Sequence, residues 1–318
     1  CNRPDTPMIR ILATGGTIAG TADAASGGLR YRAAALPVAQ LLGNMDGLDG
    51  LPLEAEQVLS LDSKDMRPAD WLVLLAATRR ALQDPQVSGV VILHGTDTME
   101  ETAYFLHLTL PPGKPVLITG AMRPADHPAA DGPANILAAL ALVGRANEGQ
   151  QGVQVCMNGQ AFAARQVFKA RSTGLDAFDS LHAPSCAAGS AGHFAALQVN
   201  TLPEVFVLPG YAGAPAELID ASVVAGARGL VLALTGHGSV PTAWEAALAR
   251  AQAAGVVVLR ASRCSGPVSR NANADDDGRD WLTAGDLPPA KTRIALMLAL
   301  AAGWSRQFPA WDRARLHH

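Results

Sequence analysis

The chain alternates short, continuous apolar runs with longer segments in which apolar residues recur at helical spacing. Continuous apolar runs of about four to eight residues are typical of strands buried on both faces of a parallel sheet. Because the two kinds of segment alternate, the pattern predicts an α/β fold with right-handed crossovers. The predicted strands are Ile9–Ala13, Val90–Leu93, Val116–Thr119, Val153–Met157, Val205–Leu208, Leu230–Leu234 and Val256–Leu259.

The segments between these strands carry helix signals. Pro68 suits a first helical turn, and apolar residues follow it on one helix face at Trp71, Leu74, Leu75 and Leu82. Thr98 and Glu101 have the spacing of a capping box, which predicts a helix that begins at Met99. Other helical segments are expected from Pro133, over Leu282–Pro289 with its Pro-Pro end, and over Lys291–Ala302.

A change in composition marks the best domain boundary. Ala183–Gly192 is rich in Ala, Gly, Ser and Pro, and the part after it has a βαβαβα rhythm of its own. We therefore predict a large N-terminal α/β domain over residues 1–188, with a mostly parallel sheet flanked by helices. A linker over 189–204 and a smaller C-terminal α/β domain over 205–318 would follow.

Composition excludes several classes of function. Of the 318 residues, 49% are hydrophobic and 17% are charged, so the chain can build a sizeable core. The net charge of −3 gives no basic surface for nucleic acid. No apolar stretch reaches the roughly 18 residues of a membrane-spanning helix.

The four cysteines, at positions 1, 156, 186 and 264, form no CxxC pair or zinc-type cluster, so no metal is expected. Their wide spacing favours reduced thiols over disulfides. Cys156 lies in an apolar run and is interpreted as a small core residue.

Two threonine-bearing motifs follow predicted strands. Thr14-Gly15-Gly16-Thr17-Ile18-Ala19-Gly20 comes directly after the apolar run Met8–Ala13, and the segment from His94 to Ala103, HGTDTMEETA, comes after Gly89–Leu93. Ligands of open α/β sheets bind at the carboxyl ends of the strands. A threonine hydroxyl in such a turn suggests a nucleophile, although it needs a base or a strong hydrogen bond to react.

The residues alone leave other interpretations open. Gly15-Gly16 is a turn signal that lets the backbone approach a ligand closely, but the motif is neither GxGxxG nor a phosphate-binding loop. Asp97 is either a turn former or a carboxylate that holds a substrate ammonium. For His94, at the end of a buried strand, a hydrogen-bonded structural role is favoured over a catalytic one.

Together, TGGTIAG and HGTDTMEETAYFL resemble the bacterial L-asparaginases, a family of two-domain amidohydrolases, and the match is closer to the type II pattern. The resemblance runs from about Ile9 to Ala302, nearly the whole chain. It is supported by the segments Asp62-Ser63-Lys64-Asp65-Met66, Gly120-Ala121-Met122-Arg123-Pro124, Ala130-Asp131-Gly132-Pro133-Ala134-Asn135 and Phe168-Lys169-Ala170-Arg171.

The resemblance implies hydrolysis of L-asparagine to L-aspartate and ammonia, without metal or organic cofactor. Thr17 would be the nucleophile that attacks the side-chain amide and forms a β-aspartyl ester. Tyr31 would hydrogen-bond to Thr17. Thr96, Lys169 and Asp97 would form a relay that positions or activates water and the leaving group, because a lysine in a dry site can act as a base.

The resemblance also implies a set of substrate-binding residues. Ser63 would bind the α-carboxylate of the substrate, and Asp97 would bind its α-ammonium. Ser239 would be contributed to the site by the second domain of a neighbouring subunit. The full set is Gly16, Asp62, Ser63, Lys64, Thr96, Asp97, Ser239 and Asn273.

Two positions depart from the family pattern near the amino-acid head group. Lys64 stands where well-known periplasmic members have glutamine, and Asn273 stands where they have a glutamate that helps to hold the substrate ammonium. We therefore expect low glutaminase activity. An acidic residue within Asp275–Asp277 either substitutes for that glutamate or is a plain turn residue.

The implied assembly is a homotetramer, a dimer of intimate dimers. Alternative functions are a broad glutaminase–asparaginase and, from another class, a non-catalytic amino-acid-binding protein on the same fold. A cytoplasmic location is favoured because residues 2–155 contain no cysteine for the first-domain disulfide of many periplasmic members. The alternative is a periplasmic protein or one anchored by a lipid on Cys1.

Overall fold

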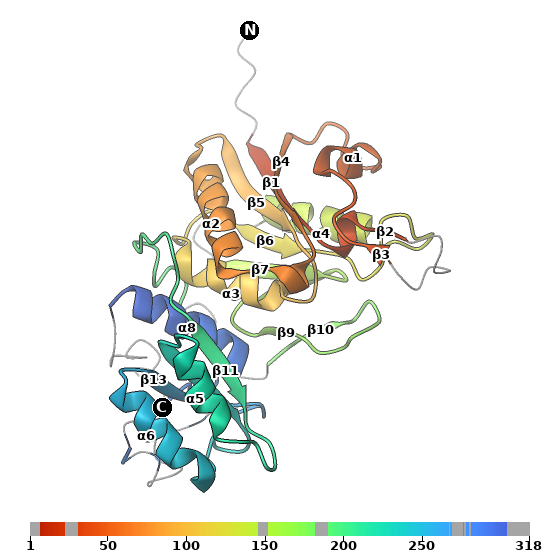
Figure 1. The fold of residues 1–318 in the computed structure, drawn as a ribbon. Coiled ribbons are helices and arrows are strands. Elements are labelled where there is room, and N and C mark those ends of the chain that lie inside the picture. Colours follow the sequence, from red (N-terminus) through yellow and green to blue (C-terminus); the bar gives the residue numbers. More distant parts are fainter. Residues whose placement is uncertain are drawn as a thin grey trace. The chain divides into compact units, whose positions relative to one another are not determined.

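The computed structural model describes residues 7–22, 31–145, 152–181, 190–266, 268, 276, 278–279 and 281–303, without the side chains of Ala22, Tyr31 and Arg32. This part of the chain divides into two compact units. The first contains the described residues up to Leu181 together with 190–196, and the second begins at Leu197. Figure 1 shows the elements of both units along the chain.

A six-stranded sheet forms the centre of the first unit, in the order β4-β1-β5-β6-β7-β8. Its strands are β1 (Met8–Gly15), β4 (Leu53–Leu61), β5 (Val87–Leu93), β6 (Val116–Thr119), β7 (Val153–Met157) and β8 (Gln160–Ala163). Neighbouring strands are parallel except β8, which is antiparallel to β7. The predicted mostly parallel sheet is therefore confirmed.

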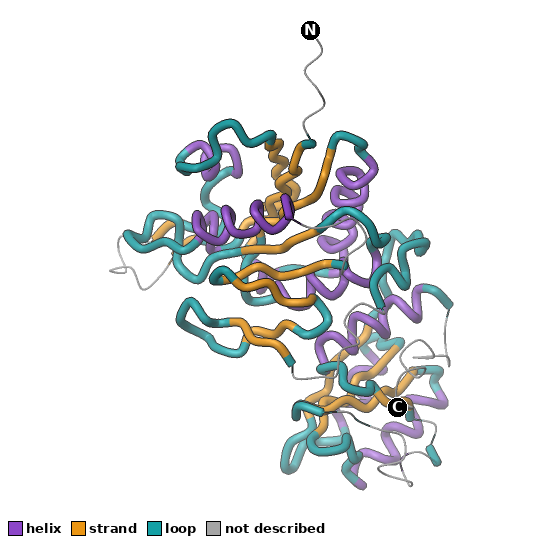
Figure 2. The backbone as a smooth tube through the Cα atoms, turned by 180° about the vertical axis from the view of Figure 1, so that it is seen from behind, coloured by secondary structure: helices purple, strands orange, loops and turns teal. Residues whose placement is uncertain are grey.

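Two small antiparallel ribbons accompany this sheet. One pairs β2 (Thr21–Ala22) with β3 (Tyr31–Arg32), and the other pairs β9 (Val167–Lys169) with β10 (Phe178–Ser180). Seen from behind, β9 and β10 form a separate hairpin beside the main sheet (Figure 2). Lys169 therefore lies on a strand that has no partner strand in the main sheet.

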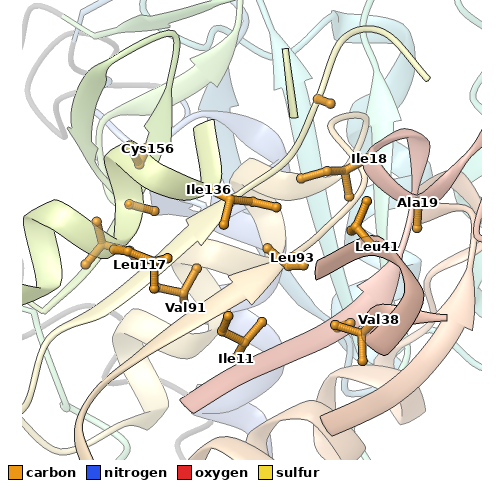
Figure 3. Packing of buried hydrophobic residues seen from close by; sticks show 14 of the residues in the cluster. Ile11, Ile18, Ala19, Val38, Leu41, Val91, Leu93, Leu117, Ile136 and Cys156 are labelled. Carbon is orange, nitrogen blue, oxygen red and sulfur yellow. The ribbon is translucent and has the colours of Figure 1, made fainter. Parts of the chain in front are cut away.

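Helices cover both faces of the main sheet. Side chains of α1 (Val38–Gly43) and α4 (Gly132–Arg145) pack on one face against alternate strand residues such as Ile11, Val91 and Leu117 (Figure 3). The intervening strand residues point to the other face, where α2 (Pro68–Gln83) and α3 (Met99–Thr109) contact the sheet. Burial on both faces explains why these strands read as continuous apolar runs.

The second unit has a four-stranded parallel sheet in the order β11-β12-β13-β14. The strands are β11 (Val205–Pro209), β12 (Gly229–Leu234), β13 (Val257–Ser262) and β14 (Leu282–Thr283). Helices α5 (Glu217–Val224) and α6 (Glu245–Ala253) and the short helix η4 (Thr242–Trp244) share a buried apolar cluster with this sheet. Helix α8 (Pro289–Ala301) also packs on the strands.

Three details differ from the sequence expectations. Strand β4 was missed because each of its residues is either half-buried or exposed and none is fully buried, as suits the edge strand next to β1. Thr98 precedes α3 as predicted, but its hydroxyl donates to Ser63 O at 2.7 Å and makes no cap hydrogen bond. Within Leu282–Pro289, residues 282–283 form β14, because they pair in parallel with β13.

Cys156 is completely buried in β7, so its interpretation as a small core residue is confirmed (Figure 3). Burial raises the pKa of its thiol to about 11. The free Cys264 is exposed. Within the described residues, no helix is both long and apolar enough to cross a membrane.

Candidate active site

The two threonine motifs leave neighbouring strands of the main sheet. β1 and β5 are parallel, and Ala13 of β1 is opposite Leu93 of β5. At this point the Thr14 hydroxyl donates to Leu93 O at 3.0 Å. Because parallel strands end at the same edge of the sheet, both motifs begin side by side.

The turns that follow are in direct backbone contact. Gly16 has a φ of +84°, which favours glycine, and a Cβ atom at this position would lie 2.3 Å from Gly95 Cα. A Cβ on Gly95 would lie 2.5 Å from Ser63 Oγ. Glycine at both positions therefore allows three segments to meet: the turn after β1, the turn after β5 and the short helix η3 (Ser63–Asp65).

Both threonines lie close to this contact and are mostly shielded from solvent. Thr17 opens the short helix η1 (Thr17–Ala19) directly after Gly16, and 7% of its surface is exposed. Thr96 follows Gly95 and is 6% exposed. Two buried hydroxyls at one sheet edge match the chemistry that a hydroxyl nucleophile and a proton-transferring partner require.

Lys169 connects two residues of the second motif. Its Nζ donates to Thr96 Oγ1 at 2.9 Å and to Asp97 Oδ1 at 2.6 Å. The lysine side chain is 18% exposed, whereas that of Asp97 is 48% exposed. Since Nζ donates to the Thr96 hydroxyl oxygen, the hydroxyl hydrogen is not used in the contact with the lysine.

Ser63 is held between the same segments. It is buried, and its Oγ accepts from the backbone N–H of Asp97 at 3.2 Å. Next to it, Lys64 Nζ forms ion pairs with Asp62 at 2.5 Å and Asp65 at 3.5 Å, and its side chain is 60% exposed. The hydrogen bond to Asp62 raises the pKa of Lys64. The cation at position 64 is therefore balanced locally by its neighbours.

His94 supports the second motif from inside the core. Its Nδ1 lies 2.6 Å from Gly95 O, and its Nε2 lies 3.0 Å from Thr102 Oγ1, which accepts from Trp71 Nε1 at 3.0 Å. Because the Gly95 carbonyl oxygen can only accept, Nδ1 carries the proton, and the Thr102 hydroxyl donates to the unprotonated Nε2. Burial lowers the pKa of His94 to about 4, which makes it a neutral, hydrogen-bonded residue.

The described geometry does not test the remaining candidate residues. The backbone of Tyr31 lies in β3, its side chain is outside the described part, and Asn273 also lies outside the described residues. Ser239 is exposed in the second unit. There, Asp276 is buried, pairs with Arg260 at 3.4 Å and accepts from Val240 N, so this carboxylate has a structural position.

One acidic residue next to the site was missed by the sequence interpretation. Glu100, in the first turn of α3, accepts the backbone N–H of Lys169 at 2.6 Å. Its position within the second motif could have indicated a role in the site. However, an acidic residue in the first turn of a helix is common because the helix dipole favours it there. Among the described residues, no group of three or more His, Cys, Asp or Glu side chains is arranged to hold a metal ion.

Comparisons with known proteins agree with this architecture. The family model "Asparaginase, N-terminal" matches residues 8–200, and the model "Glutaminase/Asparaginase C-terminal domain" matches residues 204–308. These matches cover most of both units. The chain belongs to the asparaginase family, as its motifs predicted.

Individual relatives cover nearly the whole chain. A "Probable L-asparaginase periplasmic" from Haemophilus influenzae is 37% identical, over 94% of this chain and 90% of the relative. A "Glutaminase-asparaginase" from Pseudomonas fluorescens is 34% identical, over 91% of this chain and 85% of the relative. The crystal structure of a "Probable Cytoplasmic L-asparaginase" from Campylobacter jejuni superposes with a TM-score of 0.88 at 32% identity, covering 96% of this chain and 99% of the other.

Proposed function

We propose that this chain hydrolyses L-asparagine to L-aspartate and ammonia, with Thr17 as the nucleophile. Thr17 Oγ1 attacks the side-chain amide carbon, and backbone N–H groups near Thr96 stabilise the oxyanion. The amide nitrogen takes up a proton and leaves as ammonia, while the acyl group remains as a β-aspartyl ester on Thr17. Water then hydrolyses the ester and frees the hydroxyl.

The observation that carries this proposal is the bridge from Lys169 to Thr96 and Asp97. Lys169 Nζ donates to Thr96 Oγ1 at 2.9 Å, which leaves the Thr96 hydroxyl hydrogen available to a leaving nitrogen or a water. The contact of Gly16 with Gly95 supports a shared site, because it brings the Thr17 turn against the Thr96 turn. Thr96, Asp97 and Lys169 would then transfer and return protons in both stages.

Substrate recognition is proposed for the residues around this bridge. Ser63 would bind the α-carboxylate, and the Asp97 carboxylate, half exposed at 48%, would bind the α-ammonium. The Gly16 backbone would border the amide. Lys64 and its partner Asp62 would lie near the amino-acid head group.

Thr17→Ala is the direct test of the nucleophile. We expect ammonia release from asparagine to be lost while the circular dichroism spectrum and melting temperature stay as in the wild type. Thr21→Ala is the matched control, because Thr21 lies in β2 and has no assigned role. Hydroxylamine should intercept the ester in the wild type and give aspartyl hydroxamate. Full turnover by Thr17→Ala would refute the assignment.

The same ammonia assay separates the enzyme from a non-catalytic amino-acid-binding protein, which would bind asparagine without releasing ammonia. A broad glutaminase–asparaginase is the second candidate function. It is favoured by relatives that carry that name, such as the Pseudomonas fluorescens protein at 34% identity. We propose low glutaminase activity instead, and equal kcat/KM values for asparagine and glutamine would favour the second candidate.

We further propose a homotetramer in which Ser239 completes the site of a neighbouring subunit. Thr17→Ala and Ser239→Arg should each be inactive, and co-refolded at equal amounts they should recover about a quarter of the wild-type activity. That fraction follows because half of randomly formed dimers are mixed, and each mixed dimer has one intact site of two. Light scattering measures the assembly, and absence of recovery would place Ser239 within its own subunit's site.

The cellular location stays a prediction. We propose the cytoplasm, with the periplasm or a lipid anchor on Cys1 as the alternatives. Fractionation of the native host with an antibody to this chain would decide between them.

A further inference from the structure

The strand that carries Lys169 needs an attachment outside its own hairpin. β9 pairs with β10 in a two-stranded ribbon, apart from the main sheet that ends in the two threonine motifs (Figure 2). Lys169 Nζ sits at the end of a flexible four-carbon side chain. Its placement on Thr96 and Asp97 therefore depends on how firmly the Lys169 backbone is held relative to α3.

The backbone N–H of Lys169 points away from its hairpin. The next amide, Ala170 N–H, donates within the hairpin to Ala177 O at 2.8 Å. Successive amides of an extended strand point to opposite edges, so the Lys169 N–H faces outward. On that side the carboxylate of Glu100 accepts it through Oε2 at 2.6 Å.

Glu100 belongs to the same segment as the residues that Lys169 must reach. It lies in the first turn of α3, three residues after Asp97, where a carboxylate is favoured by the helix dipole. A hydrogen bond to an ionised acceptor is shorter and stronger than one between neutral groups. This segment therefore binds Lys169 at two places. Glu100 accepts a hydrogen bond from its backbone N–H, and Thr96 and Asp97 accept hydrogen bonds from its ammonium group.

We infer that Glu100 is a positioning residue for the reaction: it fixes the backbone of Lys169 so that Nζ bridges Thr96 and Asp97. This inference rests on the proposed function, because it assigns Glu100 a role only through Lys169. Glu100 itself touches neither the substrate nor the reacting atoms in this role. Its loss should slow the chemical step and leave substrate binding intact.

The test compares Glu100→Ala, Glu100→Gln, Lys169→Met and the double variant Glu100→Ala/Lys169→Met in steady-state asparagine hydrolysis. Glu100→Ala should lower kcat by about 10- to 100-fold, the scale expected for a misplaced catalytic group, with KM within about twofold. Glu100→Gln keeps an oxygen that can accept the N–H, so it should recover kcat to within about threefold of the wild type.

The double variant separates positioning from general support of the fold. If Glu100 acts through Lys169, Glu100→Ala should cause less than about a twofold further loss in the Lys169→Met background. Equal losses in both backgrounds, or an unchanged kcat in Glu100→Ala, would overturn the inference. Glu217→Ala removes a carboxylate from the first turn of α5 in the second unit, and it is the matched control for charge and stability.

Failure of the proposed function gives a different result. If Lys169→Met keeps the wild-type kcat, the relay itself is wrong, and the positioning role of Glu100 falls with it. If Lys169→Met is impaired and Glu100→Ala is not, the relay stands and only the positioning role is wrong. Melting temperatures of all variants identify any loss that comes from unfolding.

Discussion

Acidification should weaken the first unit through His94, because this buried residue must stay neutral to keep its hydrogen bonds. The Thr102 hydroxyl donates to His94 Nε2 while accepting from Trp71 Nε1. A proton on Nε2 would turn that nitrogen into a donor and leave the Thr102 hydroxyl hydrogen without its acceptor. A charge would also be created in a fully buried position.

The magnitude follows from the pKa values of the two states. Burial holds the pKa of folded His94 at about 4, against an ordinary value of 6.5. Since the folded pKa is the lower one, the contribution is fully present above pH 6.5 and is lost as the pH falls toward 4. The gap of about 2.5 pH units, at about 1.36 kcal/mol for each, amounts to about 3 kcal/mol in total. About 2 kcal/mol of this should be lost by pH 5.

Urea denaturation of the wild type and His94→Gln at pH 7 and pH 5 measures this contribution. Glutamine cannot take up the proton, so between these pH values the wild type should lose about 2 kcal/mol more unfolding free energy than the variant. The exposed His237→Gln is the matched control and should retain the wild-type dependence. Parallel pH dependences of the wild type and His94→Gln, within about 0.5 kcal/mol, would refute the reasoning.

Packing, burial and charge give three further predictions. Gly16→Ala should lower the free energy of unfolding by at least about 1–2 kcal/mol and remove most of the activity, because the new Cβ would lie 2.3 Å from Gly95 Cα at a φ of +84°. Urea denaturation measures the stability and the ammonia assay measures the activity. Wild-type values in both would contradict the close contact. Cys264 should react rapidly with iodoacetamide because it is exposed, and Cys156 should react only after unfolding because burial raises the pKa of its thiol to about 11. Peptide mass spectrometry measures the labelling of each cysteine. Equal labelling rates in the folded protein would contradict the burial of Cys156. Lys64→Gln should raise kcat/KM for glutamine relative to asparagine if the cation at this position disfavours the longer substrate, and an unchanged ratio would remove Lys64 from the selectivity.

Much of the fold was readable from local sequence. All predicted strands are present, and most of them are central strands buried on both faces, which requires continuous apolar runs such as that of β5. The edge strand β4 was missed for the complementary reason: it pairs with β1 alone, and because none of its residues is fully buried it tolerates polar residues. The side chain of Thr98 could not be predicted either, because Ser63 O, a tertiary partner, accepts its hydrogen bond.

The sequence by itself determined the two glycine-threonine turns, the α/β framework and, through its motifs, membership of the asparaginase family. The family resemblance implied that Thr96, Asp97 and Lys169 act together, but only the tertiary structure shows the contacts that join them. Lys169 and Asp97 are 72 residues apart along the chain, and their ion pair depends on a hairpin outside the main sheet. Local propensities specify a turn or a strand, because these depend on neighbouring residues. The position of an ammonium group relative to a hydroxyl depends on the packing of distant segments, which no local pattern encodes.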